Sequence, residues 1–147
     1  MNRSEKALTL FAKGFNCSQA VLTVFADDFG IEEELALKLG TQFGGGARNG
    51  EICGAVSGAL LVLGLKYGHY EQGNTEQKSK AYSIASEYTR RFKEKNGSIV
   101  CRELLGYDLT KPEDSERIKE KNLFGTVCPA MIKSAVDVLE GILADYE

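Results

Sequence analysis

Residues 49–65 read NGEICGAVSGALLVLGL, and this stretch decides the fold. Residues 52–65 form a 14-residue run of apolar and small side chains. The run suits a buried helix and is shorter than the roughly 20 residues of a membrane-spanning one. Gly50, Gly54 and Gly58 recur every four residues, which places them on one face of that helix. Because an interior glycine costs about 1 kcal/mol relative to alanine, we expect another helix backbone to approach closely there.

Helix signals recur along the rest of the chain, and no alternation typical of a strand appears. Asn2 with Glu5, and Asn16 with Gln19, have the spacing of helix capping boxes. The glycine-rich stretch 39–50 is predicted to be a loop. We expect helices over residues 2–14, 16–30, 32–39, 49 to between 64 and 68, 74–95 and 98–106, then one capped by Thr110 with Glu113 and one starting at Cys128 and Pro129. The sequence therefore predicts an all-α fold, a single domain over residues 1–147 built as a bundle of about seven or eight helices.

Charge and composition exclude several functional classes. The net charge is −3, and lysines and arginines alternate with acidic residues instead of forming a basic stripe. We therefore expect no nucleic acid and no anionic membrane surface as partner. The first residues, MNRSEKALTLF, lack the long apolar core of a secretion signal, so we expect a soluble cytoplasmic protein without membrane insertion. A homo-oligomer is compatible with this sequence, as is a monomer.

The four cysteines share one position in this prediction, because each lies at or just after an expected helix start. They are Cys17, Cys53, Cys101 and Cys128, which follow Asn16, Asn49 and Ser98 or precede Pro129. In a reducing compartment such cysteines are more often thiols, metal ligands or redox partners than permanent disulfides. The unpaired amides and positive dipole end of a helix start lower the pKa of a thiol, which makes it more reactive at neutral pH. If the four starts converge, they form one electropositive pocket lined with sulfur.

Cys53 and Cys17 are the leading candidates for reactive thiolates, because they belong to the first turns of the two most apolar early helices. Cys101 and Cys128 would then resolve a disulfide or complete a metal site. The glycines after Cys53 have two interpretations. They serve tight packing alone, or they bring a partner helix close enough for Cys53 to meet another cysteine.

The segment Cys53-Gly54-Ala55-Val56-Ser57-Gly58 matches a CGAxxG signature. With single cysteines at 17, 101 and 128, the chain resembles over essentially its whole length the C_GCAxxG_C_C family, whose members are proposed to be redox-active. The resemblance implies redox activity through the four cysteines, with a bound metal centre as a further option. A covalent haem is not expected, because the chain has no CxxCH motif.

Three functions remain open at this point. The first is a thiol–disulfide oxidoreductase with an unknown redox partner, although the chain lacks the CxxC pair common in such enzymes. The second is a four-cysteine centre, either an iron–sulfur cluster for electron transfer or a structural zinc, with Cys17, Cys53, Cys101 and Cys128 as ligands. The third is a helical interaction or ligand-binding module whose cysteines only pack.

Two further features have a functional and a plain interpretation. His69, the only histidine, is a candidate ligand or proton donor near the sulfur site, and a surface loop residue is the favoured alternative. Residues 44–50, GGGARNG, resemble a phosphate loop only superficially, because no strand precedes them and no Gly-Lys-Ser/Thr follows. Their amides and Arg48 could bind an anion, and a flexible connector is favoured instead.

Overall fold

The central pair of the fold is α2 (Cys17–Ala26) packed against α4 (Gly54–Tyr67), the two helices with the most apolar sequences among the early elements. The computed structural model describes all 147 residues and is all-α. The other α-helices are α1 (Arg3–Ala12), α3 (Glu33–Gly40), α5 (Thr75–Asn96), α6 (Cys101–Leu105), α7 (Pro112–Glu120) and α8 (Leu123–Asp145). The predicted all-α domain of seven or eight helices is therefore confirmed.

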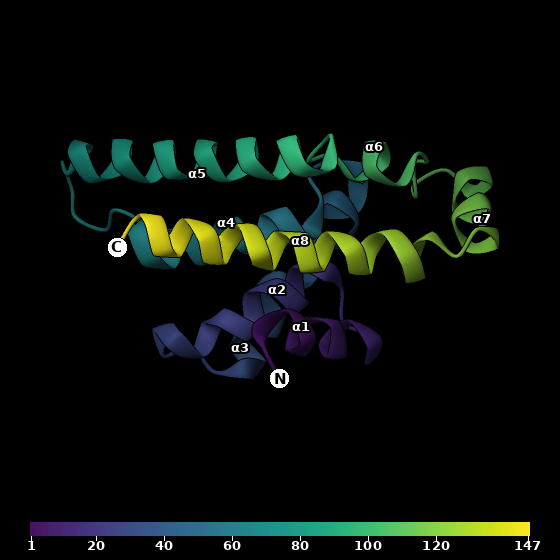
Figure 1. Cartoon of the computed structure of the whole chain (residues 1–147), viewed down its shortest axis with the longest axis horizontal. Coiled ribbons are helices and arrows are strands. Elements are labelled where there is room, and N and C mark those ends of the chain that lie inside the picture. The colour runs from purple at the N-terminus through teal and green to yellow at the C-terminus, as the bar shows by residue number, and fades with distance from the viewer.

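The long helices α5 and α8 run side by side, with α4 behind α8, as Figure 1 shows. Helices α1 to α3 lie together below them, and α6 and α7 lie at the end where α8 begins. One large cluster of buried apolar side chains joins these helices, with the side chains of α4 at its centre. A second, small cluster surrounds Ile118 of α7 and includes Cys101 and Leu105 of α6. No helix combines the length and the apolar character that crossing a bilayer requires.

The helix starts follow the predicted caps in the first half of the chain. The Asn2 side chain accepts a hydrogen bond from the Glu5 amide at 2.8 Å. Asn16 and Gln19 form a complete capping box, with each side chain accepting from the other residue's amide at 2.9 and 2.8 Å. Asn74 caps α5 in the same way. These local contacts determine where α1, α2 and α5 begin.

The glycines of α4 permit the close helix approach that the sequence predicts. A Cβ at Gly58 would lie 2.7 Å from the Ser18 carbonyl oxygen and 3.2 Å from the Ser18 Cα. A Cβ at Gly54 would overlap the Cys17 sulfur. The N-terminal half of α4 therefore lies directly on the first turn of α2. Gly50, in contrast, is not on this helix face, because it lies in a turn with φ +68° before α4 begins.

The predicted starts of α4, α6 and α7 were wrong. Asn49 does not cap α4, because Cys53 holds an extended conformation and itself precedes the first helical residue. Thr110 does not cap α7, since its hydroxyl donates to Asp108 at 2.6 Å and the helix begins at Pro112. The short helix α6 begins at Cys101, three residues after the expected cap Ser98. In each case a turn or a bridge to another segment holds the expected cap outside the helix.

The last helix begins earlier than predicted, at Leu123, so that Pro129 lies inside it. Leu123 and Val127 are one helical turn apart and both pack against the cluster around Ile118. Burial of these two side chains extends the helix toward its N-terminus. The proline, expected to mark a helix start, is accommodated in the second turn, and Cys128 is an interior residue of α8.

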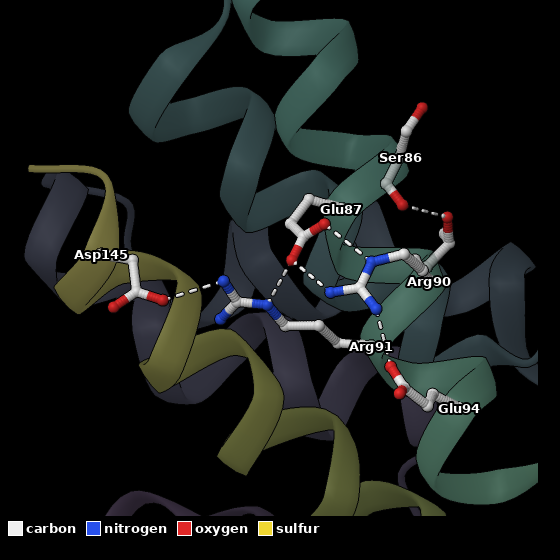
Figure 2. Close-up of polar contacts among 7 residues, drawn as sticks. Ser86, Glu87, Arg90, Arg91, Glu94 and Asp145 are labelled. Carbon is white, nitrogen blue, oxygen red and sulfur yellow. Dashed lines mark hydrogen bonds and ion pairs between the residues drawn. The ribbon is translucent and has the colours of Figure 1, made fainter.

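An ion-pair network connects α5 to the C-terminal end of α8 (Figure 2). Glu87 accepts hydrogen bonds from Arg90 at 2.8 Å and from Arg91 at 2.7 Å, and Arg91 also pairs with Asp145 at 2.8 Å. Arg90 reaches Glu94 on the same helix. The network lies at the surface, so it orients the two helices more than it stabilises them.

Candidate thiol site

The four cysteines line one cavity of about 160 Å³. Cys17 is the first residue of α2, Cys53 immediately precedes α4, and Cys101 is the first residue of α6. Cys128 comes from the second turn of α8. Residues far apart in the sequence thus place their sulfurs around a common space, at the end of the bundle where α6 and α7 lie.

Ile52 and Val100 form an isolated β-bridge. Because each of them immediately precedes a cysteine, the bridge brings together the segments that carry Cys53 and Cys101. The Cys53 amide donates to the Ile99 carbonyl at 2.7 Å, and the Cys101 amide donates to the Glu51 carbonyl at 2.6 Å. The starts of α4 and α6 are held together by these two bonds. No local pattern in the sequence indicates this pairing, because a bridge of one residue pair is too short to show strand alternation.

Cys17 has the one thiol whose pKa is lowered, to about 7. The largest cause is the Cys53 thiol, which donates a hydrogen bond to the Cys17 sulfur. Burial opposes this effect, and the backbone amides of Gly45, Ser18 and Cys17 itself lower the pKa further. Because these amides belong to the helix start and the adjacent glycine turn, Cys17 is held in the environment that the sequence predicts for a reactive thiol.

The expected lowering of the pKa does not hold for the other three cysteines. The pKa of Cys53 is raised well above its ordinary value, first by its hydrogen bond to Cys17 and then by burial, and the Ala55 and Val56 amides do not overcome these effects. Cys17 is therefore the acidic member of the two, and Cys53 keeps its proton at neutral pH.

Burial raises the pKa of Cys101 to about 11 and that of Cys128 to about 12. The negative charge of Cys17 raises both pKa values further. Cys101 begins a helix of only five residues and its amide already binds Glu51, while Cys128 has no helix start beside it. These two thiols are protonated at neutral pH.

Comparison with known protein families identifies the family of this chain. The family described as "Putative redox-active protein (C_GCAxxG_C_C)" matches residues 15–142, which include all four cysteines and the Cys53–Gly58 signature. The chain belongs to this family. No curated protein and no solved structure matches it. Within the C_GCAxxG_C_C family signature, the structure gives each glycine a clear role, because Gly54 leaves room for the Cys17 sulfur and Gly58 for the backbone of α2.

A metal or iron–sulfur centre held by all four cysteines does not fit this arrangement. No group of three or more cysteine, histidine or carboxylate side chains lies close enough together to bind one metal ion. All four cysteines line the cavity, but this does not bring three of their sulfurs to one point. Tetrahedral coordination by four cysteines needs all four sulfurs about 2.3 Å from one metal ion.

The rest of the cavity wall is mostly apolar. It is lined by Phe11, Leu104, Leu105, Leu109, Phe124, Val127 and Met131. The polar side chains are those of Asn16 and Arg48. His69 does not take part, because it is exposed and follows the far end of α4 from Cys53.

The glycine-rich segment 44–50 closes one side of the cavity as a compact turn. Gly45, Gly46, Ala47, Arg48 and Gly50 all have positive φ angles. The Gly45 amide faces the Cys17 sulfur. Sequence reasoning assigned the segment no certain role, and its contact with the thiol pair depends on how α2 and α4 pack.

Proposed function

We propose that this chain is a thiol–disulfide redox protein in which Cys17 and Cys53 cycle between two thiols and a disulfide. The observation that carries the proposal is that the Cys17 sulfur lies against Gly54, the residue after Cys53, and that both cysteines line one cavity. The lowered pKa of Cys17 supports it. A thiolate and a neighbouring thiol are the two groups that a two-step exchange requires.

The exchange proceeds in two balanced steps. The Cys17 thiolate attacks one sulfur of a substrate disulfide, forms a mixed disulfide and releases the first thiolate. Cys53 then loses its proton and attacks the Cys17 sulfur, so that the second substrate thiolate leaves and takes up a proton. The substrate gains two electrons and becomes two thiols, while the protein is left with a Cys17–Cys53 disulfide.

We assign Cys101 and Cys128 to the return of this disulfide to its thiol form. The two pack in the same small apolar cluster and line the same cavity as the first pair. In the proposed step, one of them attacks the Cys17–Cys53 disulfide, and the other closes a Cys101–Cys128 disulfide. No net electrons are needed, because one disulfide is exchanged for another, and an external dithiol then reduces the second pair.

A purely packing role for the cysteines explains the arrangement less well. Packing alone sets no requirement that four sulfurs from four segments meet at one cavity, and cysteine often replaces other small apolar residues anywhere in a core. Here Cys17 and Cys128 are half-buried and all four reach the same space.

The experiment is oxidation of the fully reduced protein by bis(2-hydroxyethyl) disulfide, a small neutral disulfide, followed by a count of free thiols and mapping of the linked peptides. We expect two thiols to disappear first, with a Cys17–Cys53 link, and dithiothreitol to restore four. In Cys53→Ala the reaction should stop at a mixed disulfide on Cys17. In Cys17→Ser the three remaining thiols should react only slowly with the oxidant. A count that stays at four in the wild-type protein would overturn the proposal.

A further inference from the structure

Arg48 is the one arginine of the chain without a carboxylate partner. Of the six arginines, five form ion pairs: Arg3, Arg90, Arg91, Arg102 and Arg117. The nearby acids are already engaged, because Glu51 pairs with Arg102 at 2.9 Å and Asp108 accepts hydrogen bonds from Thr110. Arg48 is therefore an exposed residue that is left without a carboxylate partner.

The unpaired guanidinium lies on the wall of the cysteine cavity. Its Nη1 donates to the Gly44 carbonyl at 3.1 Å, and a Cβ at Gly45 would lie 3.0 Å from the same nitrogen. Gly45 thus makes room for the guanidinium, and the amide of the same residue lowers the pKa of Cys17. Among the four thiols, the charge of Arg48 acts on Cys101, whose pKa it lowers against the larger effect of burial.

The backbone that carries Arg48 is strained. Ala47 and Arg48 have φ angles of 55° and 64°, in the left-handed region that disfavours residues with a side chain. Strain of this kind persists where the surrounding structure imposes it, and it is concentrated at functional sites. Glycine would relieve the strain at position 48, so the presence of a long cationic side chain there calls for a role of that side chain.

The size and the lining of the cavity limit which molecules fit beside Arg48. Its volume of about 160 Å³ is similar to that of an engineered apolar cavity of about 150 Å³ that binds benzene. Its wall is largely apolar. The Arg48 guanidinium is the group on it that binds an anion, and the Cys17 sulfur is the group that reacts. A matching molecule has an apolar body of a few heavy atoms and one anionic group.

We propose that the substrate of the thiol site is a small organic disulfide that carries an acidic group, which binds Arg48 while the apolar body of the molecule enters the cavity toward Cys17. This inference rests on the proposed function, since it takes Cys17 as the reacting thiol. It adds the substrate class, and it makes Arg48 the residue that selects for negative charge.

The test uses two alkylating reagents of nearly equal size, anionic iodoacetate and neutral iodoacetamide. Both transfer a two-carbon group to a thiolate and release iodide, and peptide mapping measures the rate at Cys17. The ratio of the iodoacetate rate to the iodoacetamide rate is compared with the same ratio for N-acetylcysteine amide, a neutral free thiol. We expect the ratio at Cys17 to be about three- to fivefold higher, the size of effect that one partly exposed charge produces.

Matched variants assign the effect to Arg48. Arg48→Gln should lower the ratio to that of the free thiol, and Arg48→Lys, which keeps the charge, should retain most of it. Arg117→Gln removes the same charge from the surface of α7, outside the cavity wall, and should leave the ratio unchanged. Benzoate should slow alkylation of wild-type Cys17 more than benzamide does.

A wild-type ratio no higher than that of the free thiol overturns the proposal, and this measurement needs no variant to fold. A raised ratio that survives in Arg48→Gln also overturns it. The Cys17–Cys53 disulfide is tested with a neutral oxidant, so its formation does not depend on Arg48. An unraised alkylation ratio therefore overturns the role of Arg48 alone, and a missing disulfide overturns the proposed redox function.

Discussion

Cys17 differs from the other three cysteines in the hydrogen bonds that its sulfur accepts. Burial alone raises the pKa of a thiol, as it does at Cys101 and Cys128. At Cys17 the Cys53 thiol and three backbone amides outweigh burial. One residue in an apolar cavity is therefore able to carry charge while its neighbours stay neutral.

We expect the rate of Cys17 alkylation by iodoacetamide to rise about tenfold per pH unit below pH 7 and to level off above it, because the thiolate is the reacting form. The pKa of about 7 sets the midpoint, against an ordinary value of 9.0. Cys53→Ala removes the hydrogen-bond donor, so its midpoint should move toward higher pH. A wild-type midpoint near 9, or an unmoved midpoint in the variant, would contradict this account. The rates are measured by quenching the reaction at set times and quantifying the alkylated Cys17 peptide by mass spectrometry.

The left-handed conformation of Ala47 gives a second prediction for a single residue. Ala47 is exposed and has φ +55°, where glycine carries no penalty for a Cβ. Ala47→Gly should raise the free energy of unfolding by about 1 kcal/mol. Ala130→Gly, an exposed site inside α8, should lower it by about the same amount. Urea unfolding of both variants checks the difference in sign, and a loss of stability in both would rule out strain at position 47.

Between helices, the contact of α4 with α2 depends on the absence of side chains at two positions. The close approach aligns the start of α4 with the start of α2, which places Cys53 beside Cys17. The same glycines that weaken α4 as an isolated helix therefore set the distance between the two sulfurs. This accounts for a glycine-containing signature directly after Cys53.

Gly58→Ala should destabilise the protein by about 1–3 kcal/mol, the usual cost of overpacking a tight contact. The new Cβ would lie 2.7 Å from a backbone oxygen of Ser18, which cannot rotate away. Gly64→Ala is the matched control in the same helix, because nothing lies within 4 Å of its Cβ position. It should stabilise the protein by up to about 1 kcal/mol. Equal losses at both sites would contradict the close approach at Gly58.

On the scale of the whole molecule, surface charges connect the two longest helices, from the C-terminal half of α5 to the C-terminal end of α8 (Figure 2). Glu87 has its pKa lowered to about 2 by the hydrogen bonds of Arg90 and Arg91, against an ordinary value of 4.5. A carboxylate with a lowered pKa stabilises the fold above pH 4.5, and this contribution is lost as the pH falls toward 2.

Glu87→Gln should therefore lower the melting temperature at pH 7 by a small amount, because the network is exposed and screened by salt. The difference from the wild-type protein should shrink as the pH approaches 2, where Glu87 becomes protonated in the folded chain as it already is in the unfolded one. Thermal unfolding followed by circular dichroism at neutral, mildly acidic and strongly acidic pH measures this difference in melting temperature. A difference that grows on acidification would show that Glu87 acts in another way.

Sequence reasoning predicted the helical class and most helix boundaries, and it left open whether the four cysteines converge. It misplaced the starts of α4, α6, α7 and α8, where Asn49, Ser98, Thr110 and Pro129 carry local start signals. In α8 the burial of Leu123 and Val127 against the cluster around Ile118 overrode the signal of the proline. Capping preferences are worth about 1 kcal/mol each, so the burial of a few apolar side chains outweighs them.

The order of the four thiol pKa values could not be predicted, because it depends on burial and on which sulfurs meet. All four cysteines were expected at helix starts with lowered pKa values, and only Cys17 has one. The same limit applies to Arg48, whose lack of an acidic partner becomes visible only when every carboxylate has been placed.

By itself, the sequence determined the features that depend on residues three or four apart: the caps of α1, α2 and α5, the apolar faces, and the glycine spacing that allows α4 to lie on α2. Tertiary structure alone decided that Cys17 has a lowered and Cys53 a raised pKa, that all four cysteines line one mostly apolar cavity, and that an arginine without a carboxylate partner lies on its wall. The physical reason is range. Backbone hydrogen bonds and helix periodicity act within one or two turns, whereas burial and the electrostatic environment of a thiol depend on segments brought together from across the whole chain.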